Sequence, residues 1–247
     1  MNVLYTPVIE KLEIPALQTS IHRYAVDLNR TPDDIDQSSV EGAALPAGTH
    51  PKGFHWTTTT QGDPILTKPI SATTHEQLVK LYHDTFHTEF ERGPKQIAGR
   101  FQGARLYHFD CHSMPSQGTQ AHADAGKRRP DVVISDHVGK SCSEVFLNLT
   151  VAAFEKEGLS VSVNHPYTGG RITQRYGKPE LGEETIQIEI NRALYMNEQT
   201  KEKNADFQAF SERLVRIMTT VTNEIKSRTG PFAHSRTESF SKKGTPS

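Results

Sequence analysis

Cysteine is scarce in this sequence, and no long apolar run is present. The only two cysteines, Cys111 and Cys142, are too few for a disulfide framework, and this count is typical of a reducing compartment. Residues 1–12 contain Glu10 and Lys11 and have no long apolar run, so they resemble neither a signal peptide nor a membrane-spanning helix. The sequence therefore predicts a cytoplasmic protein that has no contact with a membrane.

An excess of charge of one sign is also absent. Twenty-eight Lys and Arg side chains face twenty-nine Asp and Glu side chains, so the formal net charge is -1. No global field attracts nucleic acid, and we expect no such partner. The length of 247 residues suits one domain with one core, expected over residues 1–227. Residues 228–247, rich in Ser, Thr, Lys and Gly, are expected to form a disordered tail.

Apolar side chains alternate between helical and strand spacing along the chain. Strands are expected over residues 19–27, 104–110, 131–136, 159–164 and 185–190. Helices are expected over residues 3–12, from Thr73 or Thr74 to a stop at Gly93 and Pro94, over 143–157, and over 207–226. This order predicts helices on both sides of a mixed, largely parallel sheet.

Polar residues follow four of the predicted strands. The carboxyl ends of strands in an open α/β sheet form the crevice that holds ligands, so these residues are expected to converge on one pocket. At the end of the first strand they are Asp27, Asn29 and Arg30, at the end of the second Asp110 and His112, at the end of a later one Asn164 and the turn 165–170, and at the end of the last Glu189 and Asn191.

Asn29 and Arg30 suit the recognition of a carboxylate. A guanidinium can grip a carboxylate with two parallel hydrogen bonds, and the neighbouring amide can donate a further one. The alternative is a structural ion pair of Arg30 with Asp27, Asp33 or Asp34.

His112 lies just beyond a predicted strand, and Asp110 stands two positions before it. A metal-bound histidine usually has such a carboxylate to orient its ring, although an ordinary polar histidine fits this position too. A thiol nucleophile at Cys111 fits poorly, because adjacent strand residues point to opposite faces.

The strand 185–190 places Gln187 and Glu189 on one face and isoleucines on the other. From a rigid strand, the Glu189 carboxylate can take a proton from a metal-bound water and return it to a leaving amine. The alternative is an exposed strand glutamate opposite a lysine. Residues 164–173 combine Pro166 with two glycines, which suits either a loop that approaches a ligand closely or an ordinary turn.

Read together, several segments closely resemble the N-formylglutamate amidohydrolase family, in the right order and as far as about Lys226. They are Val26-Asp27-Leu28-Asn29-Arg30, Asp110-Cys111-His112-Ser113, Arg129-Pro130-Asp131, residues 164–170 with Ile172-Thr173, Tyr176-Gly177, and Gln187-Ile188-Glu189-Ile190 followed by Tyr195-Met196.

The resemblance implies a three-layer α/β/α sandwich similar to zinc carboxypeptidase-like hydrolases, in which a metal-bound water attacks an amide carbonyl. It implies that His112 is a zinc ligand, that Glu189 is the general base, and that Asn29 and Arg30 hold a substrate carboxylate. Contacts with the substrate are further expected from Asn164, Gly169, Gly170 and Thr173.

One part of the family pattern is not found in this chain. The family begins with a strand, a Pro-His loop and an acidic residue, which supply the other metal ligands. Residues 1–5 instead resemble the helix that follows those ligands, so we expect an incomplete zinc ligand set and a chain truncated at its N-terminus. A late start site is the favoured explanation, ahead of a deletion or an unusual metal site.

The expected function is zinc-dependent hydrolysis of N-formyl-L-glutamate or a related small N-acyl amino acid, releasing the free amino acid and formate or another acid. One alternative is a zinc amidase or carboxypeptidase that acts on peptides or cell-wall fragments. The other is a metal-free relative without catalysis.

Overall fold

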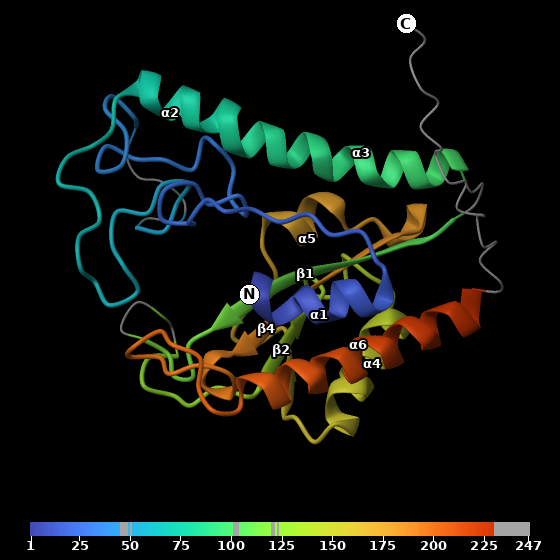
Figure 1. Ribbon diagram of the computed structural model, residues 1–247. Helices are drawn as coiled ribbons and strands as arrows, with labels where there is room; N and C mark the ends of the chain where they lie inside the picture. Colours follow the sequence, from blue (N-terminus) through green and yellow to red (C-terminus); the bar gives the residue numbers. More distant parts are fainter. Residues whose placement is uncertain (45–48, 50, 101–103, 120–121, 123, 230–247) are drawn as a thin grey trace, which may run out of the picture.

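The computed structural model describes residues 1–44, 49, 51–100, 104–119, 122 and 124–229 (Figure 1). Most of the predicted tail, residues 228–247, lies outside this part of the chain. No helix within the described ranges is both long and apolar enough to cross a membrane.

The centre of the fold is a sheet of four strands in the order β1-β4-β2-β3. The strands are β1 (Leu106–Met114), β2 (Val132–Ser135), β3 (Val161–Val163) and β4 (Glu183–Asn191). The pairs β1 with β4 and β2 with β3 are parallel, whereas β2 and β4 are antiparallel. The prediction of a mixed, largely parallel sheet is therefore confirmed.

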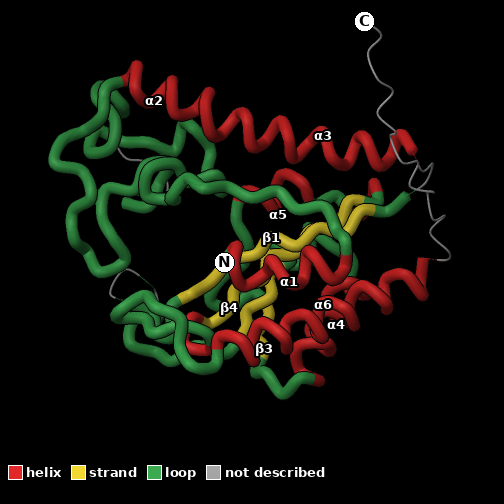
Figure 2. Tube along the Cα trace, in the orientation of Figure 1, coloured by secondary structure: helices red, strands yellow, loops and turns green. Residues whose placement is uncertain are grey.

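Helices cover both faces of this sheet (Figures 1 and 2). One face carries α1 (Asn2–Leu12), α4 (Glu144–Lys156) and α6 (Phe207–Thr229). The other carries α5 (Arg171–Tyr176) and a long helical arm made of α2 (Ala72–Leu78), the π-helical segment η1 (Val79–Asp84) and α3 (Thr85–Arg100). Two short 3-10 turns, η2 (Pro179–Leu181) and η3 (Arg192–Leu194), flank β4. The predicted α/β/α layering is confirmed.

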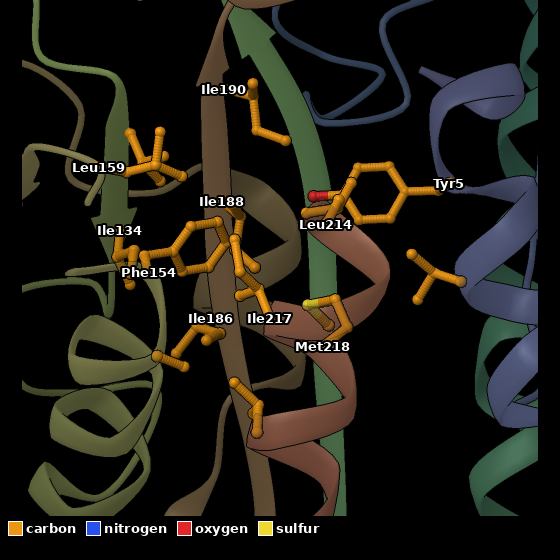
Figure 3. Close-up of a cluster of buried hydrophobic side chains, with 14 of the residues drawn as sticks. Tyr5, Ile134, Phe154, Leu159, Ile186, Ile188, Ile190, Leu214, Ile217 and Met218 are labelled. Carbon is orange, nitrogen blue, oxygen red and sulfur yellow. The ribbon is translucent and has the colours of Figure 1, made fainter. Parts of the chain in front are cut away.

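The main core fills the space between the sheet and the layer of α1, α4 and α6. Ile186, Ile188 and Ile190 of β4 are fully buried there, beside Ile134 of β2 (Figure 3). The apolar positions predicted for the last helix are buried in the same core: Phe210, Leu214, Ile217, Met218, Val221 and Ile225. Helix α4 begins at the predicted place, because the Ser143 hydroxyl accepts a hydrogen bond from the Phe146 amide.

The predicted strand over residues 19–27 is wrong. The backbone turns over residues 23–25, and the Ala25 amide donates to the His22 carbonyl. Val26 and Leu28 are nevertheless buried, because they form a second small apolar cluster with Phe54. Among the described residues, no neighbouring strand pairs with this segment.

The boundaries of the second helix also differ from the prediction. Ser71 is the N-cap in place of Thr73 or Thr74, and its hydroxyl accepts from the Thr74 amide. The arm does not stop at Gly93 and Pro94 but continues to Arg100. Its wide π-helical turn shifts the phase of the apolar stripe. Leu81, which lies within this π-helical turn, is accordingly 62% exposed.

Candidate functional site

The second face of the sheet is polar and buried. Along β4, the residues that alternate with the core isoleucines are Thr185, Gln187, Glu189 and Asn191, none more than 6% exposed. The parallel register sets Asp110 beside Gln187 and His112 beside Glu189. Two strands therefore bring the predicted ligand and the predicted base together on one surface.

A chain of hydrogen bonds connects Asn29 to Glu189. The Asn29 amide donates to Gln187 Oε1 over 3.5 Å, and the Gln187 amide donates to Glu189 Oε1 over 3.0 Å. Asn29 Oδ1 accepts from the Ile172 amide at 2.8 Å, at the start of α5. Asn29 thus joins the loop, the sheet and α5, and it lies at the predicted site although no strand precedes it.

His112 has the carboxylate partner that the sequence suggested. Its Nε2 lies 2.9 Å from Asp110 Oδ1. Burial disfavours the charged forms of His112 and Asp110, but the attraction between their opposite charges and the hydrogen bond between them have the larger effect. The pKa of His112 is raised to about 9, and the pKa of Asp110 is lowered.

Glu189 is held where a carboxyl can exchange a proton. Burial raises the pKa of Glu189, and the positive charges of His112 and Arg23 counteract part of this effect. A raised pKa brings the carboxyl closer to the working pH of a general base.

Arg23 is a candidate site residue that the sequence analysis missed. Its guanidinium donates to Asp27 Oδ2 over 2.8 and 3.2 Å and lies 4.9 Å from the centre of the Trp56 ring. Its charge acts on His112, Asp110 and Glu189. The sequence signal was the spacing of Arg23 and Asp27, but their assignment to a strand hid it.

Arg23, Arg30, Lys52 and Arg129 form a group of cations near these residues. Burial and the charges of the three arginines lower the pKa of Lys52. Arg129 is neutralised by Asp124 through two hydrogen bonds of 2.8 Å. Arg23 is likewise paired with Asp27, and the positive charge that remains favours an anionic ligand.

Arg30 faces backbone carbonyls rather than a close carboxylate. Its Nε donates to the Lys52 carbonyl over 3.2 Å and its Nη1 to the Asn29 carbonyl over 3.0 Å. The ion pair with Asp34, one of the predicted alternatives, is long at 3.9 Å, and Asp27 binds Arg23 instead. Both interpretations of Arg30 stay open on this geometry.

The glycines of residues 164–173 allow α5 to approach Asn29. A Cβ at Gly170 would lie 2.3 Å from Asn29 Nδ2, and one at Gly169, where φ is +103°, would lie 2.4 Å from Thr173 Oγ1. The Asn164 amide donates to Asp136 Oδ1 over 2.7 Å, which ties this segment to the turn after β2. Substrate contacts of Asn164, Gly169, Gly170 and Thr173 stay predictions.

A zinc ion needs more ligands than His112 provides. Asp110 orients the His112 ring and has a second buried oxygen, Oδ2, with no hydrogen-bond partner among the described residues. Within the described ranges, however, no group of three or more His, Cys, Asp or Glu side chains could hold a metal. These residues fit one ligand and its orienting partner, not a complete zinc centre.

Residues 1–196 match the family model described as N-formylglutamate amidohydrolase. The chain belongs to this family. It is 30% identical over 197 residues to the N-formylglutamate deformylase of Pseudomonas aeruginosa, a match that covers 77% of this chain and 67% of the relative. The Pseudomonas putida N-formylglutamate deformylase is 31% identical over 183 residues, which cover 71% and 62% of the two chains. The chain thus spans about two thirds of the length of these curated relatives.

The fold of this family member is also similar to a crystal structure. The N-formylglutamate amidohydrolase from Ralstonia eutropha JMP134 superimposes with a TM-score of 0.74 at 25% identity, covering 84% of this chain and 76% of the other. The resemblance found in the sequence motifs and the fold that it implied are both confirmed.

Proposed function

We propose that this protein hydrolyses the amide bond of N-formyl-L-glutamate or a related small N-acyl amino acid. The products are the free amino acid and formate or another acid. The observation that carries the proposal is the pairing of Glu189 with His112 on a buried polar face, next to a group of cations. The names of the two Pseudomonas relatives support this substrate class.

In this reaction Glu189 transfers a proton. It takes a proton from the attacking water, whose oxygen bonds to the acyl carbon, and it gives the proton to the nitrogen as the C–N bond breaks. Burial raises the pKa of Glu189, which makes its carboxylate a stronger base toward the water proton, while its acid form can still protonate the departing nitrogen. The hydrogen bond from Gln187 fixes one oxygen of the carboxyl group.

The cations provide the binding energy for an acidic substrate. N-formylglutamate carries two carboxylates, and Asn29 and Arg30 are proposed to hold one of them. Arg23 and Lys52 add positive charge on the same side, which attracts a dianion and disfavours neutral amides.

Zinc dependence belongs to the proposal as an implication of the family resemblance, with His112 as one ligand. Metal removal tests it directly. Because the described residues supply only one ligand, zinc should bind weakly, so formate release should be slow, should require added zinc and should be lost on chelation. Full activity in protein shown by elemental analysis to be metal-free would contradict this part.

We also propose a cytoplasmic location, because Cys111 and Cys142 are both free thiols.

The decisive experiment compares two glutamates of the same strand. Glu189→Gln keeps the shape of the side chain but removes the base, so kcat for N-formyl-L-glutamate should fall by about 100-fold or more. Glu183→Gln is the control, since Glu183 is 40% exposed at the start of β4 and pairs with Lys178 only at 4.0 Å. Its kcat should stay within about twofold of the unmodified protein. Equal rates in both variants would exclude Glu189 as the base, and absence of any turnover with zinc present would refute the proposed function.

A further inference from the structure

His87 of helix α3 connects two segments that are far apart in the sequence. Its Nε2 lies 3.0 Å from the Leu28 carbonyl oxygen, and its Nδ1 lies 2.7 Å from the Tyr176 hydroxyl. The side chain is only 3% exposed, and its ring stacks with that of Tyr176. The imidazole is therefore enclosed between the helical arm, the loop that carries Asn29, and the end of α5.

The chemistry of these partners determines the form of the imidazole. A carbonyl oxygen only accepts, so Nε2 carries the hydrogen and donates it to Leu28. The remaining Nδ1 accepts from the Tyr176 hydroxyl when the ring is neutral. Burial lowers the pKa of His87 to about 4, so this arrangement persists across the neutral range.

Both contacts of His87 lead to Asn29. Leu28 contributes the carbonyl of the peptide bond that precedes Asn29, so its hydrogen bond fixes the backbone at that residue. Tyr176 ends the helix whose first turn donates the Ile172 amide to Asn29 Oδ1. His87 therefore holds the backbone of Asn29 and, through α5, the partner of its side chain.

We propose that His87 is a positioning residue for Asn29 and Arg30, which it fixes against the polar face of the sheet through Leu28 and Tyr176. The consequence for substrate binding rests on the proposed function, whereas the consequence for Asn29 itself does not. A second imidazole, His55, holds the other end of the same segment through the Ala25 carbonyl.

His83 provides a matched control on the same arm. Its side chain is 7% exposed, and its ring centre lies 4.3 Å from that of His87. Its Nδ1, however, pairs with the adjacent Asp84 rather than with the loop. His83→Phe therefore disturbs the same packing without removing a hydrogen bond to the Asn29 segment.

The first measurement needs no substrate. Hydrogen exchange of the Ile172 amide reports on its bond to Asn29, and the Leu214 amide in α6 reports on global opening. In His87→Phe, protection of Ile172 relative to Leu214 should fall about tenfold, and His87→Gln, which can still donate to Leu28, should recover part of it. Unchanged relative protection in His87→Phe, or an equal loss in His83→Phe, would overturn the proposal.

The second measurement tests whether the His87 substitution weakens the binding of substrate. His87→Phe should raise KM for N-formyl-L-glutamate about tenfold with kcat within about threefold, and His83→Phe should leave KM unchanged. A protein without turnover would refute the proposed function alone, because the exchange of Ile172 still decides the role of His87. A fall in kcat at constant KM would show that His87 does not act through the binding of substrate.

Discussion

The two faces of β4 are equally buried but chemically opposite. Ile186, Ile188 and Ile190 are fully enclosed on one face, and Gln187 and Glu189 on the other are only 4% and 6% exposed. Burying apolar groups stabilises a fold, whereas burying polar groups costs free energy unless each is paired. The comparison indicates that one face maintains the fold and that the other holds a site at some expense of stability.

The pairing on the polar face supports this division. Most of its groups are joined by hydrogen bonds from Asn29 through Gln187 to Glu189. Asp110 Oδ2 and His108 Nδ1, both on β1, are buried and have no hydrogen-bond partner in the part of the chain that the structure describes. Buried polar atoms left unpaired are rare in ordinary cores and common where a protein binds a ligand.

The largest effect is expected from a substitution on the apolar face. Ile188→Ala leaves a cavity between the sheet and its helices, so the free energy of unfolding should fall by about 2–5 kcal/mol. Ile188→Val, the control, removes one methylene and should cost about 1 kcal/mol. Urea denaturation measures both. A loss below about 1 kcal/mol for the alanine variant would mean that this face contributes far less to the fold than its burial indicates.

The chemical difference between the two faces of β4 could be predicted from the sequence, because it depends only on the alternation of neighbouring residues. Alternation in residues 185–190 separates the isoleucines from Gln187 and Glu189 whatever the rest of the chain does. The expected strand over residues 19–27 failed for the converse reason. Its β-branched and aromatic side chains favour a strand, but a strand also needs a neighbour, and here Val26 and Leu28 pack on Phe54 instead.

The difference between local and long-range signals also explains which candidate site residues could be predicted. Asn29, His112 and Glu189 were predicted because each lies in a recognisable motif, and the structure brings the three together, while their roles stay predictions. Arg23 was missed because residues 19–27 were assigned to a strand, and His87 was missed because its partners lie far along the chain. A histidine in a helix carries no sign that it will meet a carbonyl 59 positions away.

The pH dependence of stability tests the burial of His87. Burial lowers the pKa of His87 from 6.5 to about 4, so the unfolded chain takes up a proton before the folded protein does. Stability is therefore lost as the pH falls through this window, by about 2 kcal/mol between pH 7 and pH 5 for this one side chain. His55 and His75, whose pKa values are also lowered by burial, act in the same direction.

His87→Phe should lose less stability than the unmodified protein over the same pH interval, by about 2 kcal/mol. Ile188→Val removes no titrating group, so its pH dependence should match that of the unmodified protein. Denaturation curves at pH 7 and pH 5 decide this. An identical decrease in all three proteins would mean that His87 titrates normally in the folded state.

The smallest expected effect concerns the edge of the polar face, where Arg30 either holds the substrate or only secures its loop. Lysine keeps the charge of Arg30 but loses the planar fork, so Arg30→Lys should raise KM for N-formyl-L-glutamate about tenfold, equivalent to about 1.4 kcal/mol, with kcat nearly unchanged. Arg216→Lys on α6, where the arginine pairs with Glu157 at the surface, controls for the substitution itself.

A substrate without the α-carboxylate, 4-formamidobutanoate, separates the two roles of Arg30. If the guanidinium grips that carboxylate, Arg30→Lys removes nothing that this analogue uses, and KM for the analogue should change by less than about twofold. If Arg30 acts instead through the Lys52 and Asn29 carbonyls, the loop moves for every substrate and both KM values should rise together. An equal rise would assign Arg30 to the loop rather than to the substrate.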